Sequence, residues 1–176
     1  MKHFLLFFLI FSSTCTNAQT KSESDKAYID SIEKYIYSYE QDSLDSELSN
    51  IQASGFITKK KFKLFRRTIG GFSEYTAWNE DNYQYFNYWY GDNYLNKRKY
   101  EDLYFSLYFK DNQLVKYVKE VENKKYAYKT TAYFKGKELI SVETNDPNFS
   151  LEEIRKDEVK AVEILDSDIK SREKYK

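Results

Sequence analysis

The sequence predicts an α+β fold: an N-terminal helix, an antiparallel β-meander of about five to seven strands, and a C-terminal helix. The first observation is that apolar residues recur at helical spacing before residue 49 and after residue 150. The second is that hydrophobic and polar side chains alternate with a period of two between residues 56 and 144. The third is that short hydrophilic turns separate the alternating segments, as they do between antiparallel neighbours.

The first 18 residues have the pattern of a cleavable export signal. A short basic start precedes an apolar run of eight residues, Phe4–Phe11, which is too short for a membrane span of about 20 residues. Small residues at Thr16 and Ala18 favour cleavage before Gln19. We therefore expect a single mature domain, residues 19–176, in the periplasm or outside the cell, with no transmembrane segment.

A lipoprotein is the alternative interpretation of the same segment, with Cys15 acylated and made the new N-terminus. The lipoprotein peptidase prefers a Leu-like residue three positions before the cysteine and a small residue directly before it. Ser12 and Thr14 occupy these positions, so lipid anchoring is the less favoured outcome.

Cleavage would remove the only cysteine, histidine and methionine of the chain, which are Cys15, His3 and Met1. A mature domain without thiol or imidazole cannot build zinc or copper sites from these ligands, or Ser–His–Asp and Cys–His nucleophiles. Five glycines leave little room for a phosphate-binding loop. We expect no metal, no cofactor and no enzymatic activity.

Charge is balanced, with 28 basic and 28 acidic residues in the full chain, and Lys2 is the only one of them in the signal. A domain with almost no net charge has no long-range attraction for nucleic acid or anionic lipid. Nucleic acid is therefore not an expected partner, and the sequence leaves the oligomeric state open.

The N-terminal helix is expected over residues 22–48, with a possible break at 41–43 and an end before Gly55. Ser22 or Ser24 can cap its start. Its apolar stripe consists of Tyr28, Ile29, Ile32, Tyr35, Ile36 and Tyr39.

In the sheet region the clearest alternation is that of Leu103, Phe105, Leu107 and Phe109. Turns are expected where Gly, Asn and Asp gather. They lie at Gly70-Gly71, Asn79 to Asn82, Gly91 to Asn93, Asp111-Asn112, Glu122 to Lys125 and Lys135 to Lys137.

An internal echo links residues 108–115 to residues 133–140, each with an aromatic pair, a tight turn and an aliphatic return strand. Residues 89–95 form a looser third copy. The unit resembles the hairpins of variant MORN-repeat proteins, a family that includes proposed toxin–antitoxin partners. The spacing is irregular and Asp111-Asn112 lacks the turn glycine of that family, so no function follows from the resemblance.

Asn145 to Asn148 ends the sheet region, and a helix is expected from about 151 to 172. Ser150 and Glu153 fit a capping box, with the serine as N-cap. Ile154, Ala161, Leu165 and Ile169 form its apolar stripe. The segment 159–165 also fits a strand.

Aromatic residues are unusually dense, with twenty between residues 72 and 134. Cross-strand packing in the core is one explanation, and a platform for a glycan or protein is the other. With Asp111-Asn112 as the turn, the alternation predicts that both helices cover the face of Phe105 and Phe109. The opposite face is expected to carry Tyr104, Tyr108, Tyr117 and Lys119, and these four residues and Trp89 are the candidate ligand-binding residues.

A basic patch is the second candidate surface, with six positive charges within nine residues. It could bind an anionic glycan, a lipid head group or an acidic partner, or simply protect an edge strand from aggregation. The residues are Lys59, Lys60, Lys61, Lys63, Arg66 and Arg67.

The function expected from these features is that of an exported, non-catalytic interaction domain that binds a protein or glycan through its Tyr-rich sheet face. A small inhibitor or immunity protein of an exported enzyme is the alternative. A carboxylate-dependent hydrolase is the third, and Asp102, between Tyr100 and Tyr104, is the acid that it would use.

We predict that the exported protein begins at Gln19, because small residues stand at the two positions that the signal peptidase reads. Intact-mass spectrometry of protein secreted by its host checks this. A mass that fits an acylated Cys15 would overturn the prediction.

Overall fold

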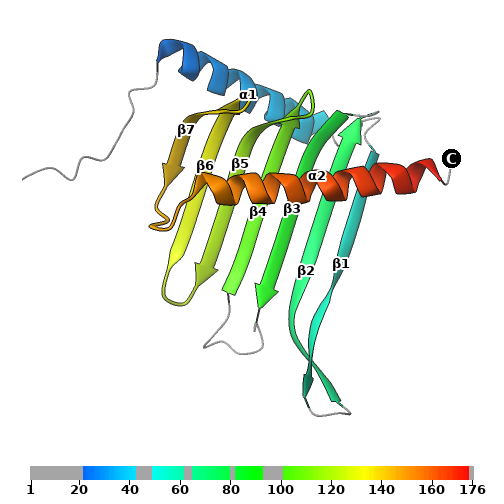
Figure 1. The fold of residues 1–176 in the computed structure, drawn as a ribbon. Coiled ribbons are helices and arrows are strands. Elements are labelled where there is room, and N and C mark those ends of the chain that lie inside the picture. The colour runs from blue at the N-terminus through cyan, green and yellow to red at the C-terminus, as the bar shows by residue number, and fades with distance from the viewer. Residues whose placement is uncertain (1–21, 43–48, 62–64, 80–81, 93–100, 175–176) are drawn as a thin grey trace, which may run out of the picture.

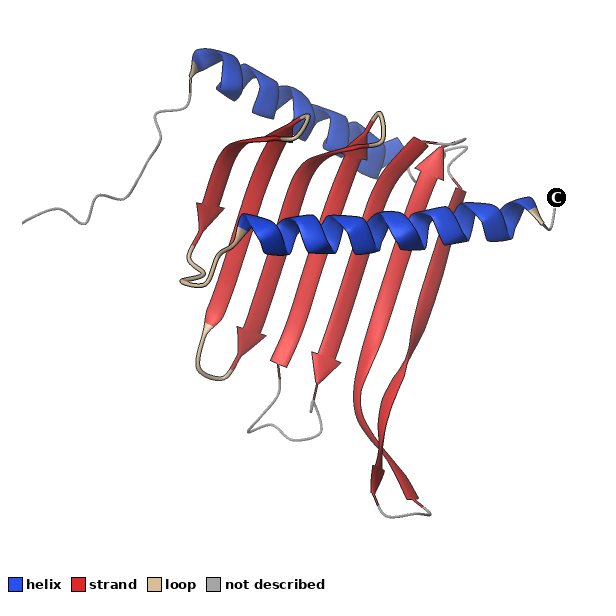
Figure 2. Cartoon of the chain, in the orientation of Figure 1, coloured by secondary structure: helices blue, strands red, loops and turns tan. Residues whose placement is uncertain are grey.

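The computed structural model describes residues 22–42, 49–61, 65–79, 82–92 and 101–174. It confirms the predicted α+β fold, with one seven-stranded antiparallel meander between an N-terminal and a C-terminal helix. The strands follow one another in the sheet in chain order (Figures 1 and 2). The elements are α1 (Glu23–Asp42), β1 (Ser49–Lys61), β2 (Phe65–Asn79), β3 (Asn82–Asp92), β4 (Glu101–Lys110), β5 (Gln113–Asn123), β6 (Ala127–Lys135), β7 (Glu138–Thr144) and α2 (Leu151–Glu173).

The two helices lie on opposite faces of the sheet. In Figure 1, α2 crosses the near side of the strands, and α1 runs behind one end of them. The burial pattern agrees, because Ile32 and Ile36 of α1 pack with Val115, whereas α2 packs on a separate cluster that includes Leu114. The expectation that both helices cover the same face is therefore wrong. We call the two sides the α1 face and the α2 face.

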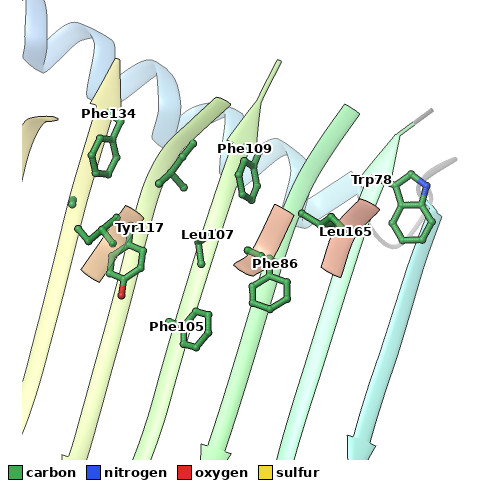
Figure 3. Packing of buried hydrophobic residues seen from close by; sticks show 12 residues of the cluster. Trp78, Phe86, Phe105, Leu107, Phe109, Tyr117, Phe134 and Leu165 are labelled. Carbon is green, nitrogen blue, oxygen red and sulfur yellow. The ribbon is translucent and has the colours of Figure 1, made fainter. Parts of the chain in front are cut away.

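The larger core lies between α2 and the sheet (Figure 3). Its phenylalanines and leucines are almost fully buried, and burial of each such side chain contributes about 1.5–3 kcal/mol. The helix contributes the predicted stripe, and segment 159–165 is helical. The core residues are Trp78, Phe86, Phe105, Leu107, Phe109, Leu114, Tyr117, Ala132, Phe134, Ile154, Ala161 and Leu165.

Polar side chains also fix α2 to the sheet. The Tyr117 hydroxyl donates a 2.7 Å hydrogen bond to Asp157, and the Thr76 hydroxyl donates one of 2.5 Å to Asp168. Burial, partly offset by the hydrogen bond from Tyr117, raises the pKa of the Asp157 carboxyl. Since a buried carboxylate needs a donor, these bonds determine where along the sheet the helix can lie.

The hairpin between β4 and β5 has a two-residue turn followed by a β-bulge. Asp111 and Asn112 have φ angles of 52° and 58°, as both central residues of a type I′ turn require. Phe109 pairs with Leu114, but the preceding Tyr108 pairs with Lys116, so Val115 is an extra residue in β5. A bulge shifts every later residue of its strand to the other face.

The hairpins β2–β3 and β6–β7 repeat this bulge. Trp78 pairs with Tyr83 and Ala77 with Tyr85, which leaves Gln84 as the extra residue. In the last hairpin, the extra residue is Ile140. The sequence echo between residues 108–115 and 133–140 thus corresponds to a repeated hairpin bulge. The hairpin of β2 and β3 has the same bulge. Of the predicted looser copy at 89–95, residues 89–92 are the end of β3, and residues 93–95 lie outside the described residues.

Two tyrosines of α1 make the same contacts with two of these hairpins. Tyr28 donates a 3.1 Å hydrogen bond to the Phe134 carbonyl, and Tyr35 donates one of 3.2 Å to the Phe109 carbonyl. Lys135 and Lys110, the next residues in the two strands, lie over the rings of Tyr28 and Tyr35 at 5.6 and 5.4 Å. Tyr28 and Tyr35 are seven residues apart in the helix, and the carbonyls that they bind are 25 residues apart in the sheet. A seven-residue step in α1 therefore matches the 25-residue step between the two hairpins.

The geometry explains this match. Seven residues advance a helix by about 10.5 Å, and two strands with one strand between them lie about 9.6 Å apart. A tyrosine every second turn therefore meets every second strand. Glu33 adds a 2.7 Å ion pair with Lys116 and accepts a 2.8 Å hydrogen bond from Tyr133, so α1 is fixed to the ends of β4, β5 and β6.

Several local predictions need correction. The first helix ends at Asp42, where the sequence pattern predicts a break, and residues 43–48 lie outside the described residues. Gly55 lies inside β1 instead of ending a helical region. The pair Gly70-Gly71 is not a turn: both residues lie within β2, opposite Asp92 and Gly91.

The expected capping box is only half present. Ser150 is the N-cap of α2, but its side chain makes no capping hydrogen bond. Glu153 instead forms a 2.5 Å ion pair with Lys119 of β5. Contact with the sheet has replaced the local interaction that the sequence pattern suggests.

The segment predicted to be an export signal, residues 1–18, lies outside the described residues. Among the helices of the described part, none combines the length and the apolar character that a membrane crossing requires.

We predict that Tyr117→Phe lowers the free energy of unfolding by about 1–3 kcal/mol, because it removes the donor to the half-buried Asp157 carboxylate. Urea unfolding followed by circular dichroism measures the loss. Tyr126→Phe is the matched control: its hydroxyl bonds Glu101 at an exposed site, so a change within about 0.5 kcal/mol is expected. Equal losses in the two variants would contradict the role of the buried bond.

Candidate functional site

The part of the α1 face that lies far from the hairpin turns has no described helix over it. The contacts of α1 with the sheet fall on residues 84, 108–110, 115–116 and 133–135, all near the hairpin turns at one end of the sheet. The rows of side chains farther from these turns meet no described helix. We call this region the open half of the α1 face.

An aromatic band crosses the open half. Phe56 of β1, Trp89 of β3 and Tyr104 of β4 lie on this face, and we call these three residues the platform. Phe56 is 76% exposed and Tyr104 is 47% exposed, whereas Trp89 is partly buried. Trp89 and Tyr104 are register partners, with ring centroids 6.2 Å apart. Exposed, preordered rings of this kind stack on sugars or enter partner pockets at low entropic cost.

The Trp89 indole lies on a strip of glycine backbone. A Cβ atom built on Gly91 would lie 2.6 Å from its Cζ2 atom, and one built on Gly71 would lie 3.4 Å from Cζ3. Gly71 and Gly91 are register partners in adjacent strands, so the indole covers both. The missing side chains let the ring lie close to the sheet, and its Nε1 is buried without a partner among the described residues.

Small polar side chains occupy the row between the platform and α1. Asn87 donates a 2.9 Å hydrogen bond to the Ser106 hydroxyl, and Tyr85 lies 3.4 Å from the same oxygen. Tyr75 packs against Tyr85 with ring centroids 5.9 Å apart. Amide and hydroxyl groups beside aromatic rings can both accept and donate hydrogen bonds to a polar ligand.

A carboxylate pair borders the platform on its other side. Asp102 follows Gly91 across the sheet and is the register partner of Glu122. Burial raises the pKa of the Asp102 carboxyl, and the charge of Glu122 raises it further. Neither carboxylate forms an ion pair with a described residue. Two neighbouring acids are the minimum for acid–base chemistry, and Asp102 is the one flagged from the sequence.

The five candidate ligand-binding residues are split between the two faces. Trp89, Tyr104 and Tyr108 share the α1 face, although Tyr108 packs against α1 and its ring is tilted against that of Tyr85, with centroids 4.8 Å apart. Tyr117 and Lys119 lie on the α2 face, where they bond Asp157 and Glu153. Their expected place beside Tyr104 is wrong because the bulge at Val115 moves them to the other side.

The basic patch is described only by its backbone. Lys59, Lys60 and Lys61 end β1, the first edge strand of the sheet, and pair with Arg67, Arg66 and Phe65 of β2. Figure 1 shows this hairpin extending beyond the other strands, away from α1. Lys63 lies outside the described residues, as does Tyr100.

Within the described residues, no group of three or more His, Cys, Asp or Glu side chains is placed to hold a metal ion. The chain matches no protein-family model, and comparisons with curated proteins and with solved structures found no match.

Sequence reasoning missed Phe56, Gly71 and Gly91. The signal for the glycines was present, since a glycine inside a strand marks a close approach by another group. The sequence pattern instead predicts a turn at Gly70-Gly71 and another at Gly91 to Asn93, and it marks Phe56 only as the start of the alternating region.

We predict that Gly91→Ala displaces the Trp89 indole, because its Cβ would lie 2.6 Å from Cζ2 of Trp89 and 2.8 Å from Oδ1 of Asp102. Overpacking of this kind costs about 1–3 kcal/mol. Gly91→Ala should therefore both shift the fluorescence emission of Trp89 and lower the free energy of unfolding. Gly71→Ala is the milder control at 3.4 Å, and a larger effect there than at Gly91 would contradict this account.

Proposed function

We propose that this protein is an exported, non-catalytic binding domain whose ligand is a glycan chain held on the platform. The observation that carries the proposal is the open half of the α1 face, where Trp89 and Tyr104 lie as neighbours with no described helix above them. A broad sheet face suits an extended ligand better than a small molecule, because small ligands are usually enclosed in concave pockets.

The chemistry around the platform supports a sugar. The face of an indole packs on the C–H groups of a pyranose ring, and hydroxyls of the sugar need nearby acceptors and donors. Asn87, Ser106 and Asp102 supply these groups on the rows beside Trp89 and Tyr104. Together they offer an apolar strip with a polar border on each side.

A protein ligand is the second candidate, in line with an inhibitor or immunity protein. Phe56 favours it, because a phenylalanine side chain that is 76% exposed is an apolar anchor with no hydrogen-bonding group for a sugar. The third candidate, a hydrolase, rests on the Asp102–Glu122 pair alone among the described residues of this face.

We predict that hexasaccharides of glucose or N-acetylglucosamine, or another glycan found on an array, change the emission of Trp89. The chain has two tryptophans, so Trp78→Phe leaves Trp89 as the only reporter, and Trp89→Phe leaves the buried Trp78. A ligand on the platform should change the emission of the first variant and leave that of the second unchanged.

Tyr104→Ala should weaken this binding at least tenfold, about 1.4 kcal/mol, since it removes one of two adjacent rings. Tyr37→Ala is the matched control, because Tyr37 is 66% exposed but lies on α1. An array without a single bound glycan would exclude the sugar ligand. Equal losses in the two tyrosine variants would exclude the platform as its site.

A further inference from the structure

The two edges of the sheet differ in their protection against pairing. β1 is one edge, and its first ten residues, Ser49 to Thr58, contain neither a charged residue nor a proline. The outer side of β1 pairs with no described strand. Natural sheets normally protect an edge of this length with charges, proline, a bulge or a covering element.

The other edge shows this protection. β7 has only seven residues and carries Glu138 and Glu143, and Pro147 follows shortly after it. A bulge at Ile140 interrupts its regular pairing. In β1 the register shift with β2 comes only after Ile57, so the uncharged segment is regular. One edge of the sheet is thus protected against strand pairing, whereas the uncharged segment of β1 at the other edge is suited to pair with a further strand.

We propose that the protein forms a two-fold symmetric dimer through antiparallel pairing of the β1 edges of two copies. An antiparallel strand pair is self-complementary, as a two-fold interface requires. The charges of β1 favour this direction. When the two β1 strands pair with Ala53 at the centre, Ile57 of one copy lies opposite Ser49 of the other. Each Lys59–Lys61 run then lies beyond the start of the partner's strand. Parallel pairing would place the two lysine runs side by side, where like charges repel.

The symmetry has a consequence for the platform. Two antiparallel edge strands can be related only by an axis perpendicular to the sheet, so both copies present their α1 faces on the same side. Phe56 is three residues from Ala53, and the two exposed Phe56 side chains therefore lie near the seam of a continuous sheet. The dimer does not depend on the proposed function, but it would join two platforms into one longer surface.

Sedimentation velocity of the mature chain over a range of concentrations tests the dimer. We expect a species of twice the chain mass that dissociates on dilution. In the double variant Gln52→Lys/Ser54→Lys, the added charges on this exposed strand meet those of the partner, and the mass should fall to that of one chain. The control Val159→Lys/Ser171→Lys adds the same charge at exposed positions of α2 and should leave the dimer intact.

Hydrogen exchange provides a second measurement. It uses the unaltered chain, so it tests the dimer even where the β1 variant fails to fold. Amides that face outward within residues 49–57 should exchange more slowly at high concentration than at low concentration. A chain that stays monomeric at every concentration overturns the proposal. So does a dimer in which the exchange of this segment is independent of concentration, or a dimer that a well-folded Gln52→Lys/Ser54→Lys variant still forms.

Discussion

The rest of the structure depends on one extra residue near the start of the second strand, which occurs in the hairpins β2–β3, β4–β5 and β6–β7. The extra residue at Val115 directs Lys116 to the α1 face and Tyr117 to the α2 face. Each of these side chains then meets a carboxylate on the helix that covers its face. Because strand side chains alternate, a single bulge decides the partners of a whole strand.

The same hairpins determine where α1 can lie. Tyr28 and Tyr35 bind two equivalent carbonyls one hairpin apart, so the helix is fixed near the turns and does not extend over the full length of the strands. The uncovered rows are those in which glycines make room for Trp89. The repeated hairpin thus accounts both for the docking of α1 and for the aromatic surface left beyond it, which is the basis of the proposed binding function.

An open meander also has two edges, and this sheet treats them differently. β7 is short, charged and bulged, whereas the first nine residues of β1 are regular and uncharged. Phe56 belongs to that edge strand and to the platform at once. Ligand binding on the face and pairing at the edge would therefore involve adjacent parts of one surface, even though each rests on separate observations.

The sequence by itself determined both helices, the period-two region and most of its turns, because apolar spacing, Asp111-Asn112 and Gly136 act within a few residues of the chain. It also singled out Trp89 and Tyr104 as candidate binding residues, and the structure pairs them as register partners in β3 and β4. The tertiary structure alone decided that the helices lie on opposite faces, that Tyr117 and Lys119 turn toward α2, and that Gly71 supports an indole. A bulge leaves no mark in hydrophobic alternation when both faces of a sheet are covered, so only the pairing of the strands could reveal it.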